Sequence, residues 1–260
     1  PVRSVMPDHR QLPLAGPEET IDMLAARYDI PLLEVAGVHH AAVRSALESA
    51  HADVFLVSCF PWRLPRSVTS IVEGRALNLH PSMLPRHRGP DPLFWVYRDD
   101  DRISGVTIHR LTEQLDAGPI VGQERFLVPR GLPGDKLERQ AAELGAKLLV
   151  GAVSDLLAGS STSSDQDELA ATSESWPGEA DLAIPPDWSA ERIEHFVRGV
   201  IPLGYRPIVV DGDQEYRVRA AIGLNPGERL ARPVVVDRDV IRVSRPDGVV
   251  SLRLDTGWGA

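Results

Sequence analysis

Cysteine is almost absent from this sequence, with a single thiol in 260 residues. One cysteine excludes a disulfide framework and any metal centre built from several thiolates. It agrees with a reducing compartment, so we expect a cytoplasmic protein. No apolar run approaches the roughly 20 residues that span a bilayer, and no basic segment followed by an apolar stretch opens the sequence. We therefore expect no membrane partner.

Positive charge is also scarce. The chain has 28 Lys and Arg residues against 37 Asp and Glu residues, a formal net charge of −9. This balance disfavours a protein that coats nucleic acid, which needs a basic face, but it permits a local patch. Five arginines in the C-terminal third form either such a patch or a scattered solvated surface: Arg192, Arg198, Arg206, Arg217 and Arg219.

The first part of the chain alternates short apolar runs with helical periodicity. Helices are predicted over 17–28, 39–49 and 135–157, and strands over 2–6, 32–35, 53–60, 76–80 and 105–109. Strands separated by helices predict an α/β fold, with a Rossmann-like parallel sheet covered by helices on both faces. Ligands bind such sheets at the carboxyl ends of the strands.

A small, polar segment then interrupts the pattern, and short strands follow it. We predict a catalytic domain over 1–158, a linker over 159–172 and a C-terminal domain over 173–260. The last domain is expected to hold a helix over 189–200. Short alternating runs follow it at 206–210, 215–221, 232–236, 240–244 and 249–254. Several short strands in about 80 residues are typical of a small, OB-like β-barrel.

The residues most suggestive of chemistry lie at the end of the predicted strand 76–80. Side chains alternate along a strand, so Asn78 and His80 share a face, and Pro81 ends the strand. The loop around Asp116 can bring a carboxylate to the same edge. An amide and an imidazole can stabilise the oxyanion of a tetrahedral intermediate, while a carboxylate orients the imidazole or takes a proton. This set suits acyl transfer to an amine.

Other polar residues have simpler interpretations. His109 is expected to be a structural residue of its strand, and Cys59 a small buried hydrophobe. The acidic run 99–101 is expected to be a turn rather than a metal site, because three consecutive carboxylates do not easily converge. The run 86–88 is either a solvated loop or a means of steering an anionic ligand.

The motifs around these residues resemble those of the 10-formyltetrahydrofolate-dependent formyltransferases. That family's pattern runs N-x-H-x-S-x-L-P, then R-G, G-V-T and D-x-G. The corresponding segments here begin, in order, at Asn78, Arg88, Gly105 and Asp116. The stretches 5–33, 53–65 and 187–202 are similar to the members that act on methionyl-tRNA. The similarity therefore covers most of the chain.

The resemblance implies a formyl transferase in which Asn78, His80 and Asp116 are the catalytic triad. The residues that it places against folate are Phe60, Leu64, Ser82, Met83, Leu84, Pro85, Leu115 and Gly118. It implies 10-formyltetrahydrofolate as the formyl donor, no metal, a monomer and the amine of initiator methionyl-tRNA as acceptor.

Two departures from the family pattern leave alternatives open. The family's first strand and glycine-rich turn have no counterpart here, so we expect the chain to be incomplete at its N-terminus. The segment 7–16, where the tRNA enzymes carry a basic insertion, has one arginine and no lysine. A small amine such as an amino-sugar nucleotide is the alternative acceptor. Hydrolysis of the formyl donor, or an inactive folate-binding fragment, are the other interpretations.

Overall fold

A computed structural model describes residues 2–4 and 20–255. Its contacts divide the chain into two compact units, 1–76 and 77–260. Within the described residues, no helix combines the length and the apolar character needed to cross a membrane. The domain boundaries at 158 and 173 stay a prediction from the sequence.

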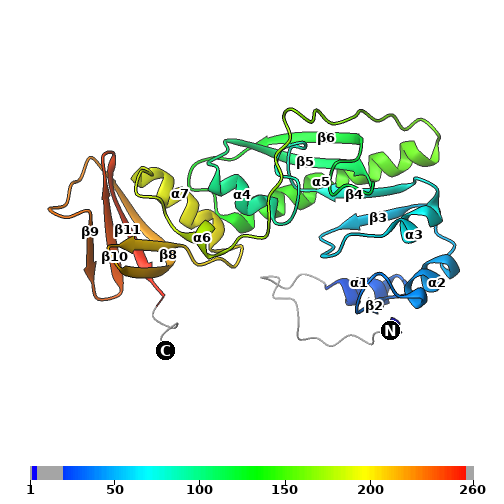
Figure 1. Cartoon of the computed structure of the whole chain (residues 1–260), viewed down its shortest axis with the longest axis horizontal. Coiled ribbons are helices and arrows are strands. Elements are labelled where there is room, and N and C mark those ends of the chain that lie inside the picture. The colour runs from blue at the N-terminus through cyan, green and yellow to red at the C-terminus, as the bar shows by residue number, and fades with distance from the viewer. Residues whose placement is uncertain (1, 5–19, 256–260) are drawn as a thin grey trace. The chain divides into compact units, whose positions relative to one another are not determined.

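The first unit contains short elements, most of which are labelled in Figure 1. Strand β1 (Val2–Ser4) pairs antiparallel with β2 (Leu33–Val35). The remaining elements are α1 (Ile21–Arg27), α2 (Ala41–Ser49), β3 (Phe55–Ser58), α3 (Arg66–Thr69) and the 3-10 turn η1 (Ser70–Val72). Burial on both faces was expected for β3, yet the Leu56 side chain is half exposed. Cys59 is exposed as well, at a positive φ of 52°, which corrects the expectation that it is buried.

The second unit begins with three neighbouring antiparallel strands, β4 (Ala76–His80), β5 (Ile103–Arg110) and β6 (Ile120–Leu127). The parallel order expected from the sequence does not extend to these strands. The short connection between β5 and β6 lacks the crossover helix that a parallel pair requires. Neither β6 nor the helix α4 (Pro92–Arg98) was predicted. The long helix α5 (Gly134–Leu157) agrees with the sequence and packs against β5 and β6.

The C-terminal region is a curled antiparallel sheet preceded by helices (Figure 1). Its strand order is β7-β8-β11-β10-β9, with adjacent strands antiparallel. The strands are β7 (Ile208–Asp211), β8 (Gln214–Pro226), β9 (Val234–Asp237), β10 (Val240–Arg245) and β11 (Gly248–Leu254), after α6 (Glu179–Leu182) and α7 (Ala190–Val200). An α/β region followed by a small β region confirms the predicted fold class.

Helix α7 packs both against the region that holds β4–β6, α4 and α5 and against the C-terminal sheet. Ser189 caps its N-terminus by accepting from the Arg192 backbone N–H. Its fully buried face, which includes Phe196, packs with Phe94 of α4 and with residues of the C-terminal sheet in one hydrophobic core. This shared core therefore holds β4 and β5, which carry Asn78 and His80 and the following loop with Asp116, against the C-terminal sheet.

The close approach of α7 to α4 depends on a glycine. A β-carbon at Gly199 would lie 2.1 Å from the ring of Tyr97, which is fully buried and donates its hydroxyl to the Leu132 carbonyl. We expect Gly199→Ala to lower the free energy of unfolding by about 1–3 kcal/mol, because the ring has no room to move. Gly151→Ala is the matched control on α5, because no atom of the described residues lies within 4 Å of a β-carbon there. Equal unfolding midpoints for the two variants in urea would contradict this packing.

Histidine at position 195 makes the fold sensitive to acid. Its Nδ1 atom accepts from the Gly131 backbone N–H, and desolvation by burial, with Arg130 nearby, lowers the pKa of His195 from 6.5 to about 4. The unfolded chain takes up this proton near pH 6.5 and the folded chain only near 4. Between those values, falling pH should lower the free energy of unfolding by about 1.4 kcal/mol per pH unit. Urea titrations at pH 7 and pH 5 measure this change in the free energy of unfolding. Between the two pH values, His195→Gln should lose less stability than the wild type. An equal loss in both proteins would show that His195 is not the group responsible.

Candidate active site

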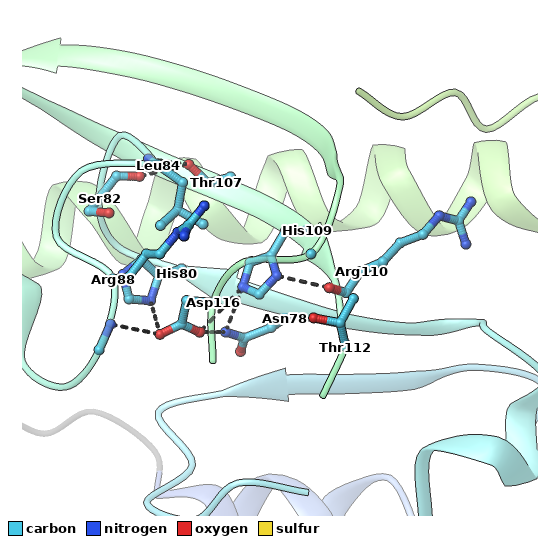
Figure 2. A network of polar contacts seen from close by, with 12 residues as sticks. Asn78, His80, Ser82, Leu84, Arg88, Thr107, His109, Arg110, Thr112 and Asp116 are labelled. Atoms are coloured by element: carbon cyan, nitrogen blue, oxygen red, sulfur yellow. Dashed lines mark hydrogen bonds and ion pairs between the residues drawn. The ribbon is translucent and has the colours of Figure 1, made fainter. Parts of the chain in front are cut away.

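Four polar side chains converge at the end of β4 (Figure 2). Asn78 and His80 come from β4, His109 lies on β5 directly opposite Asn78, and Asp116 lies on the loop after β5. The structure therefore brings together the three predicted residues and adds His109. Asn78 is partly exposed and the other three are buried, so a ligand has access from the side of the amide.

Asp116 is the centre of this cluster. One carboxylate oxygen accepts from the Gly89 backbone N–H at 2.9 Å, and the other accepts from the Asn78 amide at 3.3 Å. Burial tends to raise the pKa of Asp116. The contact with the His109 imidazole, the charge of His80 and the Gly89 hydrogen bond outweigh burial and lower that pKa below its ordinary value. The residue is thus held as a carboxylate.

His80 is fixed in one orientation by its backbone neighbour. Its Nε2–H donates to the His87 carbonyl at 2.7 Å, which leaves Nδ1 facing Asp116 at 3.7 Å. Desolvation lowers the pKa of His80 despite the opposing charge of Asp116. At neutral pH the imidazole is therefore uncharged and offers a lone pair at Nδ1, which suits a proton acceptor better than the oxyanion stabiliser suggested by the sequence.

His109 is the residue of this cluster whose role the sequence did not indicate. Its Nδ1 atom lies 3.0 Å from the Arg110 carbonyl, and its Nε2 atom lies 3.1 Å from the Asn78 amide nitrogen. The same Nε2 atom lies 3.5 Å from the Asp116 oxygen that accepts from Asn78, so the amide, the imidazole and the carboxylate meet at one point. A substrate oxygen must displace one of these contacts, and the 3.3 Å contact with Asp116 is the longer one.

The segment predicted as a linker closes around this cluster. The Gln166 amide donates to the carbonyls of Asp116 and Gly118, and its oxygen accepts from Arg88. Arg88 also pairs with Glu168 at 2.8 Å and is buried, which excludes the solvated-loop interpretation for this arginine. Asp116 has a positive φ of 50°, so these contacts hold the loop in an uncommon conformation. The small polar composition of 159–172 gave no signal of this role.

The residues predicted to contact folate lie in both units and are described separately. Phe60 and Leu64 line a mostly apolar cavity of about 330 Å³ within residues 33–68.

In the second unit, Ser82 and Leu84 are buried, with the Ser82 hydroxyl donating to the Arg86 carbonyl. Leu115 is exposed, and a β-carbon at Gly118 would meet the Arg110 carbonyl oxygen at 1.8 Å. Met83 packs over Gly105, where a β-carbon would lie 2.3 Å from its sulfur, and Pro85 follows Leu84 through a cis peptide. Folate contact at all these positions stays a prediction.

Most of the C-terminal arginines have partners within the chain. Arg198, Arg206 and Arg217 pair with the carboxylates of Glu194, Asp255 and Glu179. Arg192 lies over the Trp188 ring, and Arg219 donates to a backbone carbonyl. Such local pairing reduces the charge that these residues present to a polyanion. The segment 7–16, which lacks the basic insertion of the tRNA enzymes, lies outside the described residues.

The fold and this polar cluster define a class of protein. Residues 8–153, more than half of the chain, match the family described as Formyl transferase. The chain belongs to this family.

Relatives support that assignment, and solved structures share the fold. The chain is 31% identical over 217 residues to methionyl-tRNA formyltransferase of Nitratidesulfovibrio vulgaris, covering 83% of this chain and 66% of the relative. It is 28% identical over 235 residues to the protein of that name from Thermotoga maritima, which covers 90% of this chain and 74% of the relative. In fold it is similar to WlaRD, a sugar 3N-formyl transferase, with a TM-score of 0.62 at 17% identity over 78% of this chain and 73% of the other. It is also similar to methionyl-tRNA formyltransferase from Clostridium thermocellum, with a TM-score of 0.56 at 14% identity and 82% coverage of both chains.

Proposed function

We propose that the protein transfers a formyl group from 10-formyltetrahydrofolate to a primary amine. The observation that carries this proposal is the cluster of Asn78, His80 and Asp116 at one strand end, in a chain of the Formyl transferase family. The formyl donor is a substrate rather than a resident cofactor. The residues that would contact it are those predicted from the sequence around 60–64, 82–85 and 115–118.

Formyl transfer forms a bond between the amine nitrogen and the formyl carbon and breaks the bond between that carbon and N10 of the folate. The amine nitrogen attacks the formyl carbon, and the carbonyl oxygen takes up negative charge as the tetrahedral intermediate forms. Asn78 is the partly exposed donor available to that oxygen, once one of its N–H groups leaves its present partner. When the intermediate collapses, the bond from the carbon to N10 of the folate breaks and N10 takes a proton.

The buried pair of His80 and Asp116 would accept the proton that the attacking amine loses. His80 is neutral and holds a lone pair at Nδ1, and Asp116 beside it is ionised. Either group can accept the proton directly or through a water molecule, and the imidazolium formed at His80 would be stabilised by the carboxylate. The same pair can return the proton to N10 of the departing folate.

For the acceptor, we propose the amino group of initiator methionyl-tRNA. The support is the similarity to proteins named methionyl-tRNA formyltransferase over most of this chain, including the C-terminal region. The pairing of Arg198, Arg206 and Arg217 with carboxylates favours a second candidate, a small amine such as an amino-sugar nucleotide.

An acceptor comparison tests these alternatives. The protein and 10-formyltetrahydrofolate are incubated with methionyl-tRNA, with an amino-sugar nucleotide or with no acceptor. We expect formylated tRNA, formed with an apparent KM that rises steeply with salt because phosphate contacts release counterions. Product on the sugar alone would overturn the tRNA assignment. Formate released without an acceptor would identify a hydrolase, and bound folate with no turnover would identify a binding module.

A further inference from the structure

A second polar cluster lies beside the candidate active site and has no part in the transfer chemistry. It consists of His87, on the loop after β4, Asp99, at the end of α4, and Glu174, in the segment that follows residue 172. One ligand atom from each of the three residues lies within 4.8 Å of the others. None of them belongs to the catalytic triad.

The His87 ring has an unpaired nitrogen that points into this cluster. The side chain is 97% buried, since its relative exposure is 3%. Its Nε2 atom lies 2.7 Å from an Asp101 oxygen, a distance that fits an N–H donor. Its Nδ1 atom is buried and has no hydrogen-bond partner among the residues that the structure describes, and a Glu174 oxygen lies 3.6 Å away.

A positive species between His87 and Glu174 would satisfy this buried nitrogen. When Nε2 carries the proton, Nδ1 is a lone pair that faces a carboxylate, and two acceptors cannot satisfy each other. Either a second proton on the ring or a metal ion would resolve the contact. The Arg86 guanidinium pairs with Asp101 at 3.0 Å and approaches Asp99 only at 3.9 Å.

The separation of His87 and Glu174 fits a shared metal ion. Ligands about 2.0–2.2 Å from a tetrahedral ion lie roughly 3.4 Å apart, close to the observed 3.6 Å between His87 and Glu174. A metal-binding histidine usually donates its other ring N–H to a carboxylate, as His87 does to Asp101. One imidazole nitrogen with two carboxylates suits a divalent first-row ion such as Zn²⁺.

Backbone contacts hold two of the ligands in place without the ion. The His87 backbone N–H donates to the Thr172 hydroxyl at 2.7 Å, and the Glu174 N–H donates to the Arg88 carbonyl at 2.8 Å. A β-carbon at Gly89 would lie 2.3 Å from the Glu174 carbonyl oxygen, which shows how closely the two segments pack. The ligands therefore need little rearrangement to bind an ion.

We propose that His87, Asp99 and Glu174 bind a divalent first-row transition metal ion, with Asp101 as the outer carboxylate that orients the imidazole. The ion joins the segment at 172–174 to the loop that carries the active-site contacts. In that loop the His87 carbonyl accepts from His80, and the Gly89 N–H donates to Asp116. Its role is structural, and the site does not depend on the proposed formyl transfer.

Calorimetric titration with Zn²⁺ tests the site, using chelator-treated, tag-free protein at pH 7.5. We expect one equivalent to bind. Asp99→Asn, Glu174→Gln and His87→Gln should each abolish saturable binding. Asp101→Asn should weaken it about 10–100-fold, as expected for an outer carboxylate. Two control variants should bind Zn²⁺ as the wild type does. Asp165→Asn changes an exposed carboxylate in the 159–172 segment, and His40→Gln changes an exposed histidine.

Thermal unfolding gives a second readout that does not rely on the buried His87 variant. Zn²⁺ at about 100 times its Kd should raise the midpoint by at least about 5 °C in the wild type and leave Glu174→Gln unchanged. Absence of saturable binding at pH 7.5 would mean that the three side chains do not form a metal site. Binding that survives all three ligand substitutions would place the ion elsewhere, and either result overturns the proposal.

Discussion

Replacing Asn78 with alanine is expected to lower kcat for formyl transfer by about 10²–10³-fold, the usual effect of losing one oxyanion donor. The amide is the partly exposed member of the cluster, so it is the group that an incoming formyl oxygen meets first. Because its contribution arises as charge develops in the transition state, the KM for 10-formyltetrahydrofolate should change by only a few-fold. Steady-state kinetics with a saturating acceptor measure both parameters.

A comparison with another asparagine controls for nonspecific effects. Asn225 lies in the C-terminal sheet, where its amide donates to Glu228 at 2.8 Å, and Asn225→Ala should keep full activity. A variant at Asn78 that retains most of its kcat would remove this residue from the oxyanion site. The contacts of Asn78 with His109 and Asp116 would then be its whole role.

Replacing Asp116 with asparagine should lower kcat by about 10²–10⁴-fold, the range of general acid–base catalysis. Asparagine keeps the shape of the side chain and tolerates the positive φ of 50°, so the variant removes mainly the charge. Without that carboxylate, His80 loses the group that stabilises its protonated form. Folate binding, measured separately by fluorescence or calorimetry, should stay within a few-fold of the wild type.

Asp100→Asn provides the matched control, since Asp100 also has a positive φ, of 62°, and pairs with Arg130 rather than with the triad. It should retain activity. If Asp116→Asn loses folate binding together with turnover, Asp116 is a positioning residue for the loop and the proton must go to another group.

The sequence predicted the parts of this site that follow from strand periodicity. Asn78 and His80 share a face because they are two residues apart on a strand, and Pro81 marks where that strand ends. Most helices and strands were also located, since their apolar periods are strong. Both features depend on residues that are near neighbours in the chain.

The sequence did not predict the contacts that depend on pairing between distant segments. His109 enters the site only because β4 and β5 are antiparallel with Asn78 opposite His109, a register that neither strand encodes by itself. Gln166 lies 50 residues from Asp116 in a segment without periodicity. The acidic run was expected to be a turn whose carboxylates do not converge, yet Asp99 and Asp101 both approach Arg86, and Asp99 meets His87 and Glu174 from other parts of the chain.

Following a labelled formyl carbon tests the central claim most directly. The protein is mixed with 10-formyltetrahydrofolate carrying the label in its formyl group and with methionyl-tRNA, and the products are separated. We predict that each tetrahydrofolate released is matched by one label in an amide bond to the methionyl nitrogen. We also predict that this transfer is lost in the Asn78→Ala and Asp116→Asn variants. Label that appears only as formate, or transfer that persists in both variants, would contradict the account.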